Sequence, residues 1–253
     1  MIRRLREHSA ALVLAAVTAL GTTTAVVPTA ATSGASGHPP IVRIRQGTST
    51  NWSGYAAFGG SNAFTSVTAS WVQPAVDCSS GATTYSSFWV GLDGYNTSTV
   101  EQLGTEADCS GGHARYSSWW ETYPRPSYSA PVTVTPGHRY TASVTAGSKG
   151  TFTLKLVDNT TPQTFTTTQK ASSAKRASAE VVAEAPWSGS VLPLANFGTV
   201  SFTGATANGP TTGIGTFPNV DPITMLNPAG MKATPTGFTD AAKQSFSINW
   251  SAS

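Results

Sequence analysis

Apolar and polar residues alternate along several short stretches of this chain, and a period of two predicts β-strands rather than helices. Residues 66–72 alternate cleanly and are followed by Gln73-Pro74, a dipeptide that ends a strand. Residues 88–92 alternate as well, with an apolar face opposite a face that holds Trp89, Gly91 and then Asp93. An indole, bare backbone and a carboxylate on one face predict a functional site.

The chain turns back directly after this stretch. Asp93-Gly94-Tyr95-Asn96 supplies the Gly and Asn that tight turns use. In the strand predicted to follow, Val100 and Gln102 share one face. The Gln102 amide is therefore predicted to lie beside the aromatic face of the preceding strand.

Further alternating stretches predict strands along most of the remaining chain, with Gly, Asn and Pro between them. They fall at residues 114–121, 140–146, 151–157, 164–168, 177–183, 199–203 and 245–250. Residues 169–184 would tolerate a helix, but Ser172, Ser173 and Ser178 weaken it, so we expect a strand in the second half. Nothing repeats at a fixed period. This spacing favours an all-β sandwich or jelly roll.

Length and composition fit one all-β domain. The 253 residues are enough for a large core, and only 11% of them are charged. The net charge of +3 comes from the start of the chain, since residues 1–50 hold five Lys and Arg against one acid. From residue 51 onward ten basic residues stand against eleven acidic ones. We therefore expect no nucleic-acid partner.

The first residues have the pattern of an export signal. Arg3, Arg4 and Arg6 precede an apolar run at residues 10–20 that is too short to span a membrane. We predict a signal peptide at 1–31, a short pro-segment or linker without a core at 32–50, and the folded domain at 51–253. The mature protein is expected to be secreted, free of the membrane and monomeric.

Cys78 and Cys109 are the only cysteines of the chain. An exported protein meets an oxidising environment, where an even pair most simply forms one disulfide. We therefore predict a bridge between Cys78 and Cys109, which would staple the segment that presents Gln102.

Motifs of the familiar hydrolases are absent from the sequence. It contains no G-x-S-x-G elbow, no H-E-x-x-H, no P-loop and no Asp-Thr-Gly or Asp-Ser-Gly. His113 and His138 lack metal-ligand spacing with any other candidate, so we expect surface or packing roles for them. We expect neither a metal site nor a cofactor.

The sequence has few carboxylates, and two pairs of residues are candidates for a functional role. In residues 178–184, Glu180 and Glu184 share the face opposite to the apolar one, and Trp119 and Glu121 share a face of their own strand. On spacing alone, a solvent-facing strand edge is the commoner explanation of these acids, and the tryptophans also fit a core.

Taken together, the motifs of the chain resemble those of the glutamic peptidases, or eqolisins, pepstatin-insensitive acid proteases of fungi that are also found in bacteria. The resemblance runs over roughly residues 51–205 and agrees in the order and spacing of the motifs. These motifs are Asn51-Trp52-Ser53-Gly54, Trp89-Val90-Gly91-Leu92-Asp93-Gly94, Glu101-Gln102-Leu103-Gly104, Trp119-Trp120-Glu121-Thr122-Tyr123-Pro124 and Ala179-Glu180.

The resemblance implies a concanavalin-like β-sandwich of two antiparallel sheets, and a protein that hydrolyses polypeptides. By motif position, Gln102 and Glu180 are the catalytic residues. The residues expected to line or support the site are Trp89, Asp93, Glu121, Trp119 and Tyr123.

These assignments make chemical sense. A glutamate at its ordinary pKa of about 4.3 is an efficient general base near acidic pH, so activity in acid is expected. Glu180 would take a proton from the attacking water, and Gln102 would stabilise the oxyanion as a neutral donor.

An alternative function is carbohydrate binding or glycoside hydrolysis on the same secreted sandwich. Trp89 and Trp119 would then serve as platforms for sugar rings. A glycosidase, however, requires a second carboxylate where this chain has Gln102.

Overall fold

The computed structural model describes residues 37–253, and the regular structure of this part of the chain is β-strand apart from two short 3-10 helices. The predicted signal peptide lies outside the described residues. The strands are β1 (Arg43–Arg45), β2 (Thr48–Ser49), β3 (Trp52–Phe58), β4 (Ser66–Val72), β5 (Ser87–Leu92), β6 (Val100–Ser110), β7 (His113–Tyr123), β8 (Tyr128–Ser129), β9 (Arg139–Ala146), β10 (Thr151–Asp158), β11 (Gln163–Lys170), β12 (Ser178–Glu184), β13 (Thr199–Ala207), β14 (Val220–Asn227), β15 (Gly230–Pro235) and β16 (Phe246–Trp250). The 3-10 helices are η1 (Ser148–Gly150) and η2 (Ile214–Thr216).

The strands lie on one continuous hydrogen-bonded path. Its order is β11-β10-β9-β4-β13-β16-β15-β14-β3-β12-β5-β6-β7-β8, with β2 beside β14 and β1 beside β2. Neighbouring strands run antiparallel, except that β2 and β14 pair in parallel. The all-β antiparallel prediction is confirmed. The expectation of two separate sheets needs correction, because β14 pairs with β3 through its first residues and with β15 through its last.

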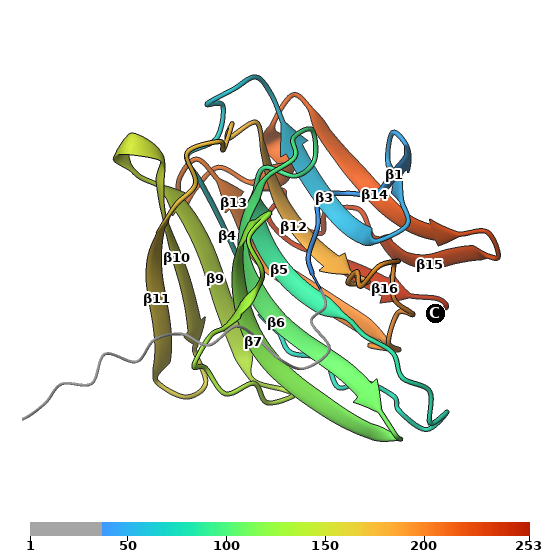
Figure 1. The fold of residues 1–253 in the computed structure, drawn as a ribbon. Helices are drawn as coiled ribbons and strands as arrows, with labels where there is room; N and C mark the ends of the chain where they lie inside the picture. The colour runs from blue at the N-terminus through green and yellow to red at the C-terminus, as the bar shows by residue number, and fades with distance from the viewer. Residues whose placement is uncertain (1–36) are drawn as a thin grey trace, which may run out of the picture.

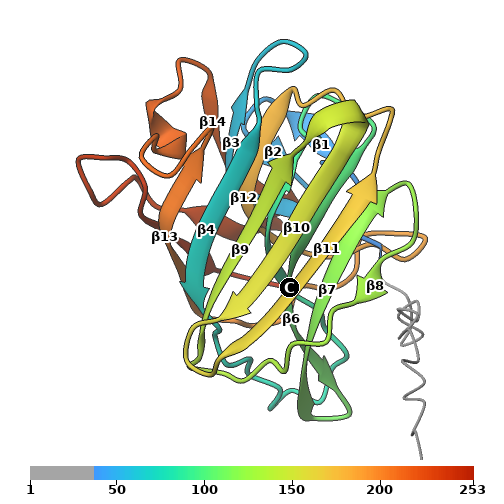
Figure 2. The same ribbon diagram turned by 90° about the vertical axis from the view of Figure 1, so that its left-hand side faces the viewer.

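The two halves of this path pack face to face around the main core (Figures 1 and 2). Strands β9 and β10 contact β5 and β6, and β4 and β13 contact β12. Alternate residues supply the core, with Val67 and Trp71 from β4 meeting Phe88 and Val90 from β5. Because alternate residues point to opposite faces of a strand, the remaining side chains of β5, β6 and β12 lie on the other face.

Each strand predicted from the alternation is present, with its ends shifted by a few residues at most sites. Strand β4 has the predicted bounds, and β12 occupies the second half of residues 169–184 as expected. The closing strands β14 and β15, and the fully buried β3, are elements that the alternation does not predict.

Residues 37–50, the described part of the segment expected to be a pro-segment or linker, add no residue to the buried apolar core, but they do contain buried polar side chains. His38 is 1% exposed and Ser49 is 0% exposed. The reason is that the segment does not leave the sheet as a linker would, since β2 pairs with β14 and Gly37 pairs with Trp187 beyond the end of β12.

Candidate active site

Strands β12, β5, β6 and β7 are neighbours in the sheet (Figure 1). Their register places Glu180 opposite Gly91, and Gly91 opposite Gln102, in one row. Strand β7 then places Glu121 opposite Gln102. Directly paired residues of antiparallel strands lie on the same face. The row therefore brings an amide and two carboxyl groups together from distant parts of the sequence.

Gly91 is the position that lets Glu180 and Gln102 share one space. A Cβ atom at residue 91 would lie 2.9 Å from a ring atom of Trp89 and 3.2 Å from Cβ of Gln102. Both distances are tighter than normal packing, so any larger residue would displace the indole or the amide. The missing side chain leaves room between the two predicted catalytic groups.

The Gln102 amide is buried, and its hydrogen bonds are made by the nitrogen and not by the oxygen. Its Nε2 donates to Oε2 of Glu121 at 2.7 Å and to the backbone carbonyl oxygen of His38 at 2.6 Å, while its Oε1 has no hydrogen-bond partner among the described residues. Burial raises the pKa of Glu121 to about 8, against the opposing effects of His38 and Gln102. Glu121 is thus a buried positioning group that aims the amide nitrogen.

Glu180 lies at the other end of the row in a fully buried position. Neither of its carboxyl oxygens accepts a well-formed hydrogen bond from the described residues. Burial raises the pKa of Glu180 well above its usual range, more than the nearby Ser178 hydroxyl lowers it, and the Asp93 and Glu101 carboxylates add to the rise. In this closed arrangement, burial therefore favours the neutral form of Glu180 relative to an exposed glutamate.

Asp93 lies behind the row and organises the chain that leads into β12. Its Oδ2 accepts the backbone amides of Lys175 and Arg176 at 2.8 and 2.7 Å, and its Oδ1 accepts that of Ala177 at 2.8 Å. A carboxylate that accepts three backbone amides fixes the local path of the chain. These three hydrogen bonds hold the residues that directly precede β12, the strand that carries Glu180.

Trp89 is also a supporting residue, because its indole is fully buried beside Glu184. The Trp89 Nε1 donates to Oε2 of Glu184 at 2.9 Å, and Trp52 Nε1 donates to Oε1 at 3.3 Å. The two indoles meet edge to face, with centroids 4.8 Å apart. A fully enclosed Trp89 cannot serve as a platform for a sugar ring, which removes support for the carbohydrate alternative.

Trp119 and Tyr123, both on β7, face the groove. The Trp119 indole stacks on the imidazole of His38, with centroids 3.6 Å apart and planes 6° from parallel. Tyr123 lines a pocket of about 420 Å³ together with Glu121, Pro124 and residues 187–189. Both residues thus lie on the strand that carries Glu121, two positions before and after it.

The groove is occupied by the chain itself, through residues 37–41, called here the N-terminal strap. Gly37 and Trp187 exchange two backbone hydrogen bonds of 2.7 and 3.0 Å, and the amide of Ile41 donates to the carbonyl of Gly94 at 3.2 Å. Between these anchors the strap passes Gln102, which binds the carbonyl of His38. The sequence gives no local signal for this contact, because Gly-His-Pro-Pro has the composition of a linker.

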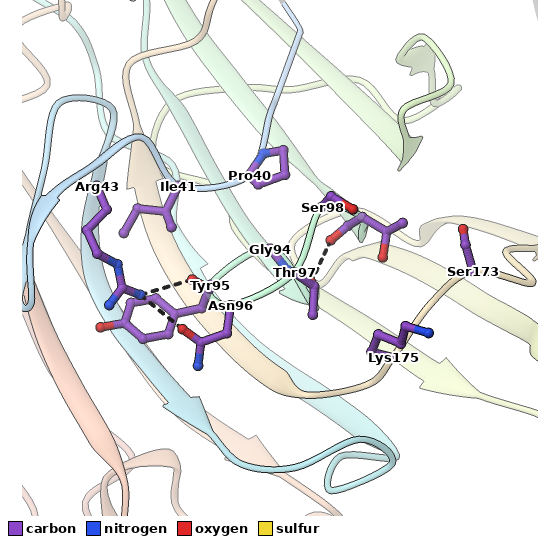
Figure 3. A pocket seen from close by; sticks show the side chains of 11 residues that line it. Pro40, Ile41, Arg43, Gly94, Tyr95, Asn96, Thr97, Ser98, Ser173 and Lys175 are labelled. Carbon is purple, nitrogen blue, oxygen red and sulfur yellow. Dashed lines mark hydrogen bonds between the residues drawn. The ribbon is translucent and has the colours of Figure 1, made fainter.

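A second hollow lies at the far end of the strap (Figure 3). This pocket of about 450 Å³ is lined by Pro40 and Ile41, by the turn after β5 and by Ser173 and Lys175. At its edge the Arg43 guanidinium lies over the Tyr95 ring and donates to the Tyr95 carbonyl. The strap therefore has one hollow along its side, lined in part by Gly37 and Pro39, and another at Pro40 and Ile41.

The predicted disulfide between Cys78 and Cys109 is present. It ties the end of β6 to the loop before β5, so the strand that carries Gln102 is covalently fixed at one end. Among residues 37–253, no group of three or more His, Cys, Asp or Glu side chains is arranged to hold a metal ion. No helix in the same range is long and apolar enough to cross a membrane.

The fold is antiparallel and all-β, and its row of an amide and two carboxyl groups is chemically suited to hydrolysis by side-chain acids. The comparisons agree. The sequence model of the peptidase A4 family matches residues 50–242, and the chain belongs to this family of glutamic peptidases. It is therefore an enzyme of the hydrolase class.

Solved structures of the same fold include three glutamic peptidases. Scytalido-glutamic peptidase with a transition state analog inhibitor is 22% identical, with a TM-score of 0.68 over 80% of this chain and 98% of that chain. SCP-B, an eqolisin in complex with the tripeptide Ala-Ile-His, is 22% identical, with a TM-score of 0.63 over the same shares. Aspergilloglutamic peptidase from Aspergillus niger is 25% identical, with a TM-score of 0.56 over 66% of this chain and 99% of that chain. No curated protein sequence matched the chain.

Proposed function

We propose that this protein is a secreted endopeptidase that cleaves polypeptides in acid, with Glu180 as general base and Gln102 as oxyanion donor. One contact carries the proposal. The Nε2 of Gln102 donates to a backbone carbonyl oxygen, that of His38, at 2.6 Å. This is the contact that a donor must make with the carbonyl group of a substrate when that oxygen becomes negatively charged.

In the proposed reaction the strap has left the groove and a substrate peptide lies in its place. Ionised Glu180 removes a proton from a water molecule, and the water oxygen attacks the scissile carbonyl carbon. The oxyanion accepts the hydrogen bond from Gln102, whose orientation Glu121 maintains. The C–N bond then breaks, and Glu180 returns its proton to the leaving nitrogen. No covalent bond to the enzyme forms.

Acidic working conditions follow from the carboxyl groups in an open groove. Water entering the groove removes the burial that raises the pKa of Glu180, so the pKa falls toward the ordinary value of about 4.3. A general base works best when its pKa lies near the working pH. Peptide substrates are supported by family membership and by the tripeptide complex of SCP-B. The proposal also states that the mature protein is monomeric and that residues 1–31 direct its export.

The test is the digestion of an unfolded protein by the purified protein from about pH 2 to 7, with and without pepstatin. We expect pepstatin-resistant cleavage. Gln102→Ala should lower kcat/KM by about 10²- to 10³-fold, the usual effect of losing one oxyanion donor. Glu180→Gln, which keeps the size of the side chain but cannot accept a proton, should remove activity.

Gln169→Ala on β11, in the other half of the sheet path, is the matched control and should retain full activity. Thermal unfolding of each variant separates loss of chemistry from loss of fold. Full activity in folded Gln102→Ala and Glu180→Gln proteins would refute the assigned pair.

A further inference from the structure

The side chain of His38 sits in a pocket built for a flat cation. Its imidazole stacks on Trp119, its Nδ1 lies 3.1 Å from Oε2 of Glu184, and its Nε2 lies 3.3 Å from Oε1 of Glu106. The residue is only 1% exposed. Burial by itself lowers the pKa of His38, but Glu106 and Glu184 raise it to about 10. His38 is therefore a buried cation between two acids and an indole.

Two further carboxyl groups face the same pocket. Burial raises the pKa of Glu121 and of Asp108 to about 8, and the charge on His38 opposes the rise at both. The pocket thus gathers four acids around His38. A neutral side chain would leave Glu106 and Glu184 without the charge that they surround, which disfavours apolar occupants.

The backbone of the strap is bound as an extended peptide would be. Gly37 and Trp187 form an antiparallel bridge, the carbonyl of His38 accepts from Gln102, and the amide of Ile41 donates to Gly94. Sheets generally recognise extended peptides in this way: backbone hydrogen bonds supply the affinity, and side-chain pockets supply the specificity. Pro39 and Pro40 stiffen the segment, so little conformational entropy is lost when it binds.

We propose that Trp119, Glu106 and Glu184 form a substrate subsite for a basic side chain, and that the strap fills this subsite as the chain's own competing peptide. This proposal rests on the proposed function. The carbonyl group bound by Gln102 belongs to His38, whose side chain fills the pocket. The basic residue of a substrate would therefore lie directly before the scissile bond. The two hollows beside the strap, of about 420 and 450 Å³, leave room for the flanking residues of a longer substrate.

Binding to the full-length His38→Ala variant tests the subsite directly. Isothermal titration calorimetry uses two acetylated tetrapeptide amides, Gly-His-Pro-Pro and Gly-Leu-Pro-Pro. We expect the His peptide to bind at least about tenfold more tightly than the Leu peptide, and Glu106→Gln in the same chain to remove this preference. Asp240→Asn, in a distant surface loop, is the control and should preserve it. Equal binding of the two peptides, or no binding of the His peptide, overturns the subsite.

Glu106 is the better acid to change, because Glu184 also holds Trp52, Trp89 and Asn51 and its loss endangers the fold. His38→Gln provides a second neutral variant, and near-ultraviolet circular dichroism verifies that each variant is folded. In His38→Ala, the weakened strap should also raise kcat/KM for every cleavable peptide above that of the unmodified chain. An unchanged or lower kcat/KM in a folded variant would refute occupation of the subsite by the strap.

Kinetics distinguish failure of the subsite from failure of the proposed function. Two matched peptides carry Lys or Leu before the cleaved bond, and we expect the Lys peptide to have at least about tenfold higher kcat/KM, a ratio that Glu106→Gln should bring near one. Cleavage without this preference refutes the subsite and leaves the peptidase standing. Selective binding of Gly-His-Pro-Pro with no cleavage at any pH refutes the peptidase and supports the subsite.

Discussion

Glu101 offers a sharp test of the buried electrostatics, because it lies next to Gln102 in sequence but points the other way. It is 0% exposed, and neither of its carboxyl oxygens has a hydrogen-bond partner among the described residues. Burial, with a contribution from the Asp93 carboxylate, raises the pKa of Glu101 to about 9. Glu101→Gln replaces the acid with a side chain of the same shape that stays neutral at every pH.

The sign and size of the effect follow from linkage. Because the pKa of Glu101 is raised in the folded state, its contribution to stability is fully present below about pH 4.5 and is lost as the pH rises toward 9. Each pH unit in this window costs about 1.4 kcal/mol. The Gln variant avoids the loss, so at about pH 7 it should be about 3 kcal/mol more stable than the unmodified protein. Near pH 3, where both side chains are neutral, the two should differ little.

Urea unfolding followed by tryptophan fluorescence, from about pH 3 to 8, measures this difference. Asp77→Asn, which changes an exposed carboxylate whose pKa is lowered by Ser79, is the control and should leave the pH profile above about pH 5 nearly parallel to that of the unmodified protein. A free-energy difference between Glu101→Gln and the unmodified protein that stays constant from pH 3 to 7 would contradict the reasoning, since it would mean that Glu101 ionises without cost.

Three further changes test how the site is supported. Gly91→Ala places a methyl group 2.9 Å from the Trp89 ring and 3.2 Å from Gln102, so it should cost about 1 to 3 kcal/mol in urea unfolding and lower kcat/KM by more than about tenfold. Asp93→Ala leaves three backbone amides without their acceptor, which should cost about 3 kcal/mol in the same assay. Replacing Cys78 and Cys109 together by Ser opens a loop of sequence separation 31, and the urea midpoint should fall by the equivalent of about 3 to 4 kcal/mol.

The strands that sequence could predict are those with one core face. Strand β4 alternates between buried and half-exposed residues along its length, and its ends match the prediction. Strand β3 is buried on both faces and contains a glycine at its centre, so its sequence shows no period of two. Strand β14 contains Pro222, which normally argues against a strand, and it tolerates the proline where it passes from one half of the path to the other.

The candidate site is harder to predict from the sequence than the strands are, because it depends on the register between strands. Each strand alone shows that Gln102 or Glu180 faces away from the core, but only the pairing of both with Gly91 puts them in one row. That pairing is set by long-range contacts, and an error of one residue would turn one of the groups to the opposite face. The resemblance to family motifs links Gln102 to Glu180, which the periodicity of the separate strands does not.

The burial of Glu180 and the strap in the groove are linked. With the strap in place Glu180 is fully buried, and this burial raises its pKa above the usual range. If Glu180 is the general base, as proposed, departure of the strap would admit both a substrate and the water that lowers this pKa. Under that proposal the strap would oppose catalysis twice, since it fills the peptide site and favours the neutral form of the base. The pKa of Glu180 would then depend on what lies across Gln102, a dependence that the local sequence does not show.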